Sequence, residues 1–126
     1  MQYESPGDQA QAAWDAVVFH DKSSYEDVEQ TLTKLNRARI KMVRAGRFVN
    51  TPDSVAREMS DIRRKIPGGS DLKRWFSTQP YEPYDFQSFV AMIRQYQSGL
   101  ARPKAEAGRR AAWDGKGDGE QDGQGD

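Results

Sequence analysis

Apolar side chains recur at helical spacing along most of the chain between residues 9 and 98. Residues 9–19 carry such a stripe around Trp14, which predicts a short amphipathic helix with Asp8 as its N-cap. A longer helix is predicted to begin at Ser23 or Ser24 and to end before Gly46, because glycine readily adopts the left-handed conformation that terminates helices. Its apolar stripe is formed by Tyr25, Val28, Leu32, Leu35, Met42 and Val43.

The third predicted helix has a strong start signal. Thr51-Pro52-Asp53 combines a capping hydroxyl, a proline at the first helical position and an acid in the first turn. Pro67-Gly68-Gly69 ends the helix. Its predicted core positions follow four-three-four spacing and are Val55, Met59, Ile62 and Ile66.

Two further helices complete the predicted fold. Ser70 opens a short helical turn that carries Trp75 and Phe76, and the prolines of residues 77–83 make that segment a connector. The last helix runs from about Tyr84 or Asp85 to Ser98. No segment alternates with a period of two, so the sequence predicts an all-α fold, a compact bundle of about five helices.

The composition changes near the C-terminus. The segment from Asp114 to Asp126 is rich in glycine and acidic residues and has no apolar periodicity. It buries too little surface to offset the entropy of ordering, so a disordered tail is predicted. The expected organisation is a helical domain over residues 1–100 and a flexible, basic-then-acidic tail over residues 101–126.

The side-chain inventory argues against catalysis. The chain has no cysteine and a single histidine, His20, which we interpret as a solvated or capping side chain rather than a functional one. Pro67-Gly68-Gly69-Ser70 resembles an anion cradle, but a helix-ending turn explains it better. We expect no catalytic, cofactor-binding or metal-binding residue and no enzyme activity.

No apolar run approaches the length of a membrane span, and the N-terminus lacks the features of a signal peptide. No membrane partner is therefore expected, and a cytoplasmic location is the expectation.

Basic residues gather in the second predicted helix, although the formal net charge of the whole chain is zero. Lys34, Arg37, Lys41 and Arg44 share the face opposite the apolar stripe. Such a face either is simply solvated or binds phosphates, and for phosphate contact we select Lys41 and Arg44. Further basic positions predicted to be exposed are Arg63, Arg64, Lys65, Arg102, Lys104, Arg109 and Arg110.

The last four of these lie in the predicted tail and suit non-specific nucleic-acid contact, for which we select Arg109 and Arg110. Aromatic residues form a second dense group near the proline-containing connector. Large side chains help a small domain to close its core, but they also favour protein interfaces. We select Trp75, Phe76 and Phe89 for assembly or core packing.

The order of features from Ala12 to Gln97 resembles the Gag capsid region of copia-type LTR retrotransposons. The matching segments, in chain order, are Ala13-Trp14-Asp15-Ala16, Met42-Val43-Arg44-Ala45-Gly46, Thr51-Pro52-Asp53-Ser54-Val55, Ile66-Pro67-Gly68 and Tyr96-Gln97. They correspond to a tryptophan-bearing helix, a long helix ending in a glycine turn, a proline-started helix, an apolar-proline motif and the end of a final helix. The chain departs from the family in having isoleucine where Leu-Pro is usual, and in lacking a cysteine–histidine zinc knuckle.

This resemblance implies a Gag-like structural protein that self-associates through helical faces. Its expected partners are other copies of itself and RNA, the latter bound weakly and without sequence preference through basic segments. The alternative is a small intracellular helical adaptor that binds another protein and has no role with nucleic acid.

Overall fold

The structure, a computed structural model, describes residues 5–22 and 24–100. Over these residues it contains helices and no strand, which confirms the predicted all-α class. The helices are α1 (Pro6–Ala16), α2 (Tyr25–Arg44), α3 (Pro52–Arg64), α4 (Asp71–Ser77) and α5 (Phe86–Ser98). The predicted tail, residues 101–126, lies outside the described residues.

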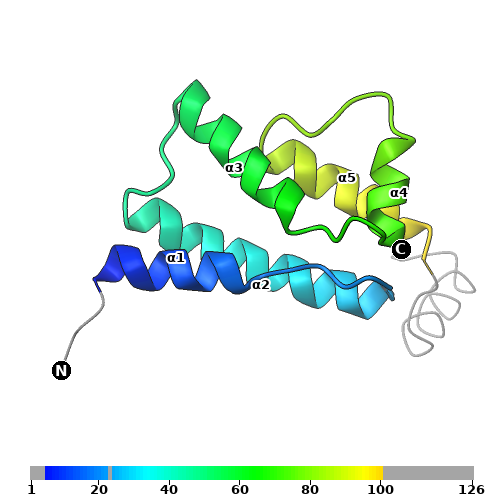
Figure 1. Cartoon of the computed structure of the whole chain (residues 1–126), viewed down its shortest axis with the longest axis horizontal. Coiled ribbons are helices and arrows are strands. Elements are labelled where there is room, and N and C mark those ends of the chain that lie inside the picture. Colours follow the sequence, from blue (N-terminus) through cyan, green and yellow to red (C-terminus); the bar gives the residue numbers. More distant parts are fainter. Residues whose placement is uncertain (1–4, 23, 101–126) are drawn as a thin grey trace, which may run out of the picture.

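The helices form two layers (Figure 1). In the first, α1 and α2 run antiparallel, side by side. In the second, α3 and α5 lie across α2, and the short α4 stands beside the end of α5. Hydrogen bonds tie the α1–α2 connection to the α3–α4 connection: the Phe19 amide donates to the Lys65 carbonyl at 2.9 Å, and the Asp71 amide donates to the Asp21 carbonyl at 3.3 Å.

The bounds predicted for the first helix are wrong at both ends. Ser5, not Asp8, is the N-cap: its hydroxyl accepts a hydrogen bond from the Asp8 amide at 3.0 Å, and Pro6 takes the first helical position. The helix ends at Ala16 because Val17 turns extended. The extended backbone leads the chain toward Lys65, whose carbonyl accepts the hydrogen bond from the Phe19 amide.

Most other helix ends follow the sequence signals, but α3 ends at Arg64, before the predicted stop at Pro67-Gly68-Gly69, so Ile66 lies after the helix. The Ser24 hydroxyl and the Asp27 carboxylate form a reciprocal capping box, and Thr51 and Asp85 cap α3 and α5. Gly46 has a φ of 74°, as expected for a left-handed terminator. The Arg47 amide donates to the Met42 carbonyl and the Gly46 amide to the Val43 carbonyl, which satisfies two carbonyls in the last turn of α2.

The core lies between the two layers. Its largest fully buried side chains are Trp14, Phe89, Leu35, Ile62, Leu72, Ile93 and Val28. One predicted core position of α2 is wrong, because Val43 is 45% exposed whereas Ala38 is buried. Ala38 lies on the side of α2 that faces α1, where residues of both helices line one groove.

Polar groups fix the second layer onto α2. The Arg39 guanidinium pairs with the buried Glu58 carboxylate of α3 at 2.6 Å and lies over the Phe86 ring of α5, 4.6 Å from its centroid. The buried Gln97 amide of α5 donates to the Tyr25 carbonyl at 3.1 Å and to the Glu29 carboxylate at 3.0 Å. These contacts specify how α3 and α5 sit on α2.

The Glu29 contacts predict a dependence of stability on pH. Hydrogen bonds from Gln97 and Arg94 lower the pKa of Glu29 below its usual 4.5. The folded state therefore holds the Glu29 proton less tightly than the unfolded state, so the stabilisation is complete above pH 4.5 and is lost as the pH falls through the lowered pKa. Because Glu29 is partly exposed, we expect Glu29→Gln to cost only about 0.5–1 kcal/mol at pH 7.

Urea unfolding of the wild type and of Glu29→Gln, at pH 7 and at steps below pH 4.5, measures this difference. Glu26→Gln is the control, because Glu26 is exposed on the same helix and makes no ion pair with a described residue. A Glu29→Gln difference that persists unchanged into strong acid contradicts the assignment.

Candidate functional site

The basic face of α2, formed by Lys34, Arg37, Lys41 and Arg44, is the first candidate site. All of its side chains are exposed, which agrees with the predicted amphipathic pattern. They recur every three or four residues, and the row is about 15 Å long at 1.5 Å of rise per residue. The sequence therefore placed Lys41 and Arg44 on one solvent-facing stripe correctly, together with Lys34 and Arg37.

The basic face borders a groove between α1 and α2. Lys34, Arg37 and Lys41 line it together with His20, and its volume is about 470 Å³. The remaining lining is mostly small or apolar and is contributed by both helices and their connection: Ala13, Ala16, Val17, Val18, Thr31 and Ala38. Small side chains on both helices leave this channel open, and the cations stand along the α2 side of it.

Ion pairing differs among the basic residues of the described chain. Carboxylates lie within 4 Å of six arginines: Arg39, Arg47, Arg63, Arg64, Arg74 and Arg94. The four cations of the basic face make no ion pair with any residue that the structure describes. Four neighbouring positive charges on one face thus have no carboxylate within ion-pair distance among the described residues, an arrangement that favours the approach of an anion.

The other two predicted phosphate-binding residues, Arg109 and Arg110, lie outside the described residues. The structure adds His20 to the surroundings of the basic face, a residue for which the sequence predicts only a solvated or capping role. His20 is exposed and also lines the groove. Only the antiparallel packing of α1 on α2 reveals this placement, because nothing in the local sequence joins residue 20 to residues 34–41.

The exposure predicted for one basic residue is wrong. Lys65 is only 5% exposed, and its ammonium group donates to the Trp14 carbonyl and, at 3.1 Å, to the Val17 carbonyl. It also lies 4.7 Å from the centroid of the Trp14 ring. Burial lowers the pKa of Lys65, and the nearby carboxylates of Asp15 and Asp61 oppose that shift. Lys65 caps the carboxyl end of α1 and belongs to the core, not to a phosphate-binding surface.

The three aromatic candidates divide between core and surface. Phe89 is fully buried and contacts the rings of Phe19, Phe76 and Phe86 with centroids 6.0–6.5 Å apart. Trp75 and Phe76 are half-buried on α4 and pack edge to face, 5.2 Å apart. Core packing therefore accounts for Phe89, while Trp75 and Phe76 keep part of their surface available.

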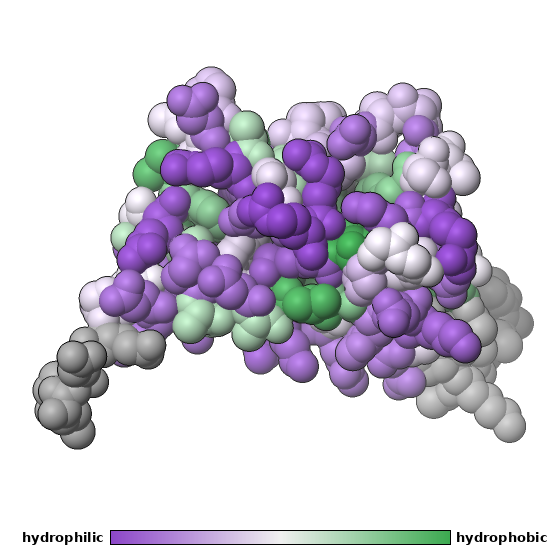
Figure 2. Space-filling model, in the orientation of Figure 1, coloured by the Kyte–Doolittle hydropathy of each residue, from purple (hydrophilic) through white to green (hydrophobic). Residues whose placement is uncertain are grey.

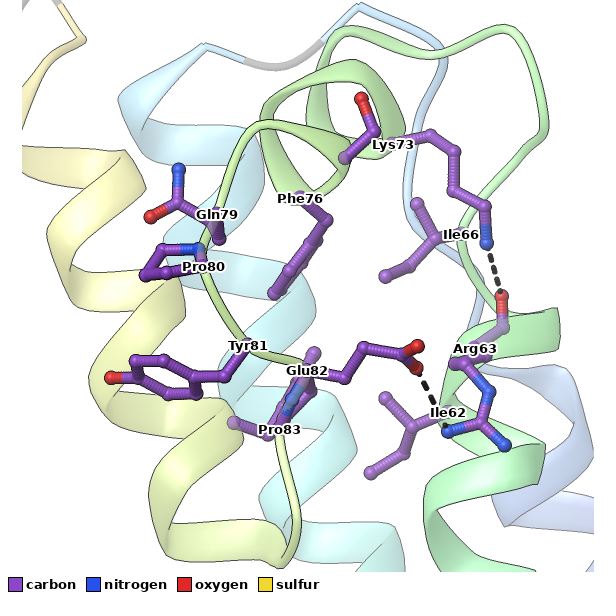
Figure 3. A pocket seen from close by; sticks show the side chains of 12 residues that line it. Ile62, Arg63, Ile66, Lys73, Phe76, Gln79, Pro80, Tyr81, Glu82 and Pro83 are labelled. Atoms are coloured by element: carbon purple, nitrogen blue, oxygen red, sulfur yellow. Dashed lines mark hydrogen bonds and ion pairs between the residues drawn. The ribbon is translucent and has the colours of Figure 1, made fainter.

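A second groove lies between α3, α4 and the connector before α5 (Figure 3). It measures about 600 Å³, and Ile62, Ile66, Phe76 and Phe89 form the apolar part of its lining. Figure 3 shows Phe76 between two isoleucines, Ile62 of α3 and Ile66 just after it, and residues 80–83 of the connector. Glu82 reaches across to Arg63 at 3.6 Å, and this exposed ion pair spans the groove. The arrangement is that of a shallow apolar surface with a polar rim.

The face seen in Figure 2 is mostly hydrophilic, with apolar side chains in small separate groups. Among the residues that the structure describes, no cluster of three or more potential metal ligands is present. None of the helices in this part of the chain has the length and hydrophobicity of a membrane span. Comparisons with protein-family models, with curated proteins and with solved structures found no match to this chain.

Proposed function

We propose that this chain is a Gag-like structural protein that contacts nucleic acid through the basic face of α2 and associates with other copies of itself. The observation that carries the nucleic-acid part is the row of four exposed cations without carboxylate partners among the described residues. The order of helices and turns that resembles a Gag capsid region supports the structural role.

The physical basis of the binding is counterion release. A nucleic acid holds condensed cations along its phosphates, and basic side chains that replace them release those cations into solution. The resulting affinity depends steeply on salt and little on base sequence. Lys34, Arg37, Lys41 and Arg44 have no internal carboxylate to give up among the described residues, so phosphate contact does not require breaking an existing ion pair.

We expect the salt dependence to report how many of these cations take part. With four phosphate contacts to a single strand, the logarithm of the binding constant should fall by about 2.8 per tenfold rise in salt, which is about 50-fold between 50 and 200 mM. Lys41→Gln combined with Arg44→Gln should reduce that slope by about 1.4. Fluorescence anisotropy with a labelled 12-nucleotide RNA across a salt series measures both quantities.

The matched control is Arg57→Gln. Arg57 is also exposed and forms no ion pair with a described residue, but it lies on α3, away from the basic face. It should leave the slope unchanged. If no RNA binds at 50 mM salt, or if the α2 double variant and the control have equal slopes, the basic face is not a nucleic-acid interface.

The apolar groove of Figure 3 favours a second candidate, a helical adaptor that binds another protein. Its apolar surface lies beside exposed aromatic residues, with Tyr81 57% and Tyr84 70% exposed, and aromatic residues are typical of protein interfaces. The adaptor hypothesis predicts no RNA binding and a strictly monomeric chain. Light scattering over a concentration series separates it from the self-associating alternative.

A further inference from the structure

The groove between α1 and α2 combines two features that a purely electrostatic surface does not need. One side carries a row of cations, and the floor beside them is apolar. Phosphates require only the cations. A floor of alanine and valine side chains instead offers contact to a flat, weakly polar group that is attached to the phosphate chain.

We propose that this groove holds single-stranded nucleic acid, with an unpaired base against the exposed Val18 and Ala16 and the adjoining phosphates on Lys34, Arg37 and Lys41. This inference rests on the proposed nucleic-acid function and adds to it the class of ligand. In a duplex the bases are stacked on each other and their faces are closed to protein. Only a single strand therefore offers an exposed base face and the adjoining phosphates at the same time.

The dimensions of the groove agree with this occupant. Its volume of about 470 Å³ lies within the range of small-ligand pockets, which begins at about 300 Å³. Lys34, Arg37 and Lys41 follow one side of it over about 10 Å at 1.5 Å of rise per residue, so they run alongside a short length of sugar-phosphate chain. His20 adds an aromatic ring to the lining.

Val18 allows the apolar contact to be tested without changing charge. Its side chain lines the groove and is 52% exposed, so its replacement disturbs the core little. Val18→Ser should weaken binding of a 12-nucleotide oligouridylate about fivefold, since roughly one partly buried aliphatic side chain is removed from the contact. It should leave binding of inorganic polyphosphate unchanged, because polyphosphate carries the same kind of charge and no base.

Val49→Ser is the matched control, because Val49 is equally exposed, at 51%, and lies in the connection between α2 and α3, outside the groove. Val49→Ser should leave the affinity for both ligands unchanged. Competition anisotropy with the full chain, with oligouridylate and polyphosphate as competitors at constant salt, gives both affinities. Cross-linking with a 4-thiouridine oligomer adds position: we expect the cross-link within residues 13–20 or 31–41.

The outcomes separate this inference from the proposed function. A Val18→Ser variant that binds oligouridylate as tightly as the wild type, or loses equal affinity for both ligands, overturns the base-binding groove and leaves the phosphate contact standing. A cross-link confined to the segment around Arg109 and Arg110 overturns the groove as well. If wild-type chain binds neither ligand at low salt, the proposed nucleic-acid function itself is wrong.

Discussion

Replacing Phe89 with alanine is expected to lower the free energy of unfolding by about 3–5 kcal/mol. Phe89 is fully buried, and its ring contacts the rings of Phe19, Phe76 and Phe86. Truncation therefore removes both apolar burial and ring contacts between α5, α4 and the α1–α2 connection. Small domains have total stabilities of about 5–15 kcal/mol, so this loss is a large fraction of the whole.

Urea denaturation followed by far-ultraviolet circular dichroism measures the loss. Phe89→Leu keeps much of the volume and should cost clearly less, which retains a measurable variant if the alanine form does not fold. Tyr84→Ala is the surface control, because Tyr84 is 70% exposed, and its cost should stay within about 0.5 kcal/mol. A Phe89→Ala variant as stable as this control shows that the ring does not belong to the core.

Replacing Lys65 with methionine is expected to destabilise the fold by about 2 kcal/mol. Methionine keeps the length and apolar stem of lysine but offers no donor, so the Trp14 and Val17 carbonyls lose the hydrogen bonds that the ammonium group now supplies. A buried acceptor without a donor costs about 1–3 kcal/mol. Removing the buried charge offsets part of this destabilisation, because desolvation opposes the charged form of Lys65.

Amide hydrogen exchange measures the loss of stability in Lys65→Met and shows in which part of the fold it occurs. The loss should be greatest for amides at the carboxyl end of α1, near the carbonyls that Lys65 now binds. Arg64→Met is the matched control, because the neighbouring Arg64 side chain is 70% exposed and its replacement should change stability little. Equal stability of the Lys65→Met variant and the wild type would mean that the hydrogen bonds only balance the cost of burying the charge.

Local signals in the sequence were sufficient for most helix ends. Thr51-Pro52, Gly46 and Asp85 act through the backbone within a few residues of themselves, so their effects do not depend on the remainder of the fold. Ser5 was missed although it too is a local cap. The apolar stripe predicts a start near residue 9, whereas Pro6 occupies the first helical position and marks the earlier start.

One part of the candidate site follows from the sequence and the other part does not. The solvent-facing row Lys34, Arg37, Lys41 and Arg44 follows from the period of an amphipathic helix, which the sequence expresses directly. The groove beside it does not, because its other wall belongs to α1 and its end to the connection with His20. Which faces of two helices meet depends on packing between residues distant in the chain.

The sequence by itself determined the helical class, most helix boundaries and the charged face of α2, because periodicity and capping are local. Tertiary structure alone decided the role of Lys65, whose position at the end of α3 looks solvent-facing until α1 is packed against it. It also decided that Val43 is exposed and Ala38 buried, since the packing of the other helices selects the covered part of α2, and Ala38 lies on the side that faces α1. In each case the outcome depends on contacts between groups that are far apart in sequence, and no local pattern records such contacts.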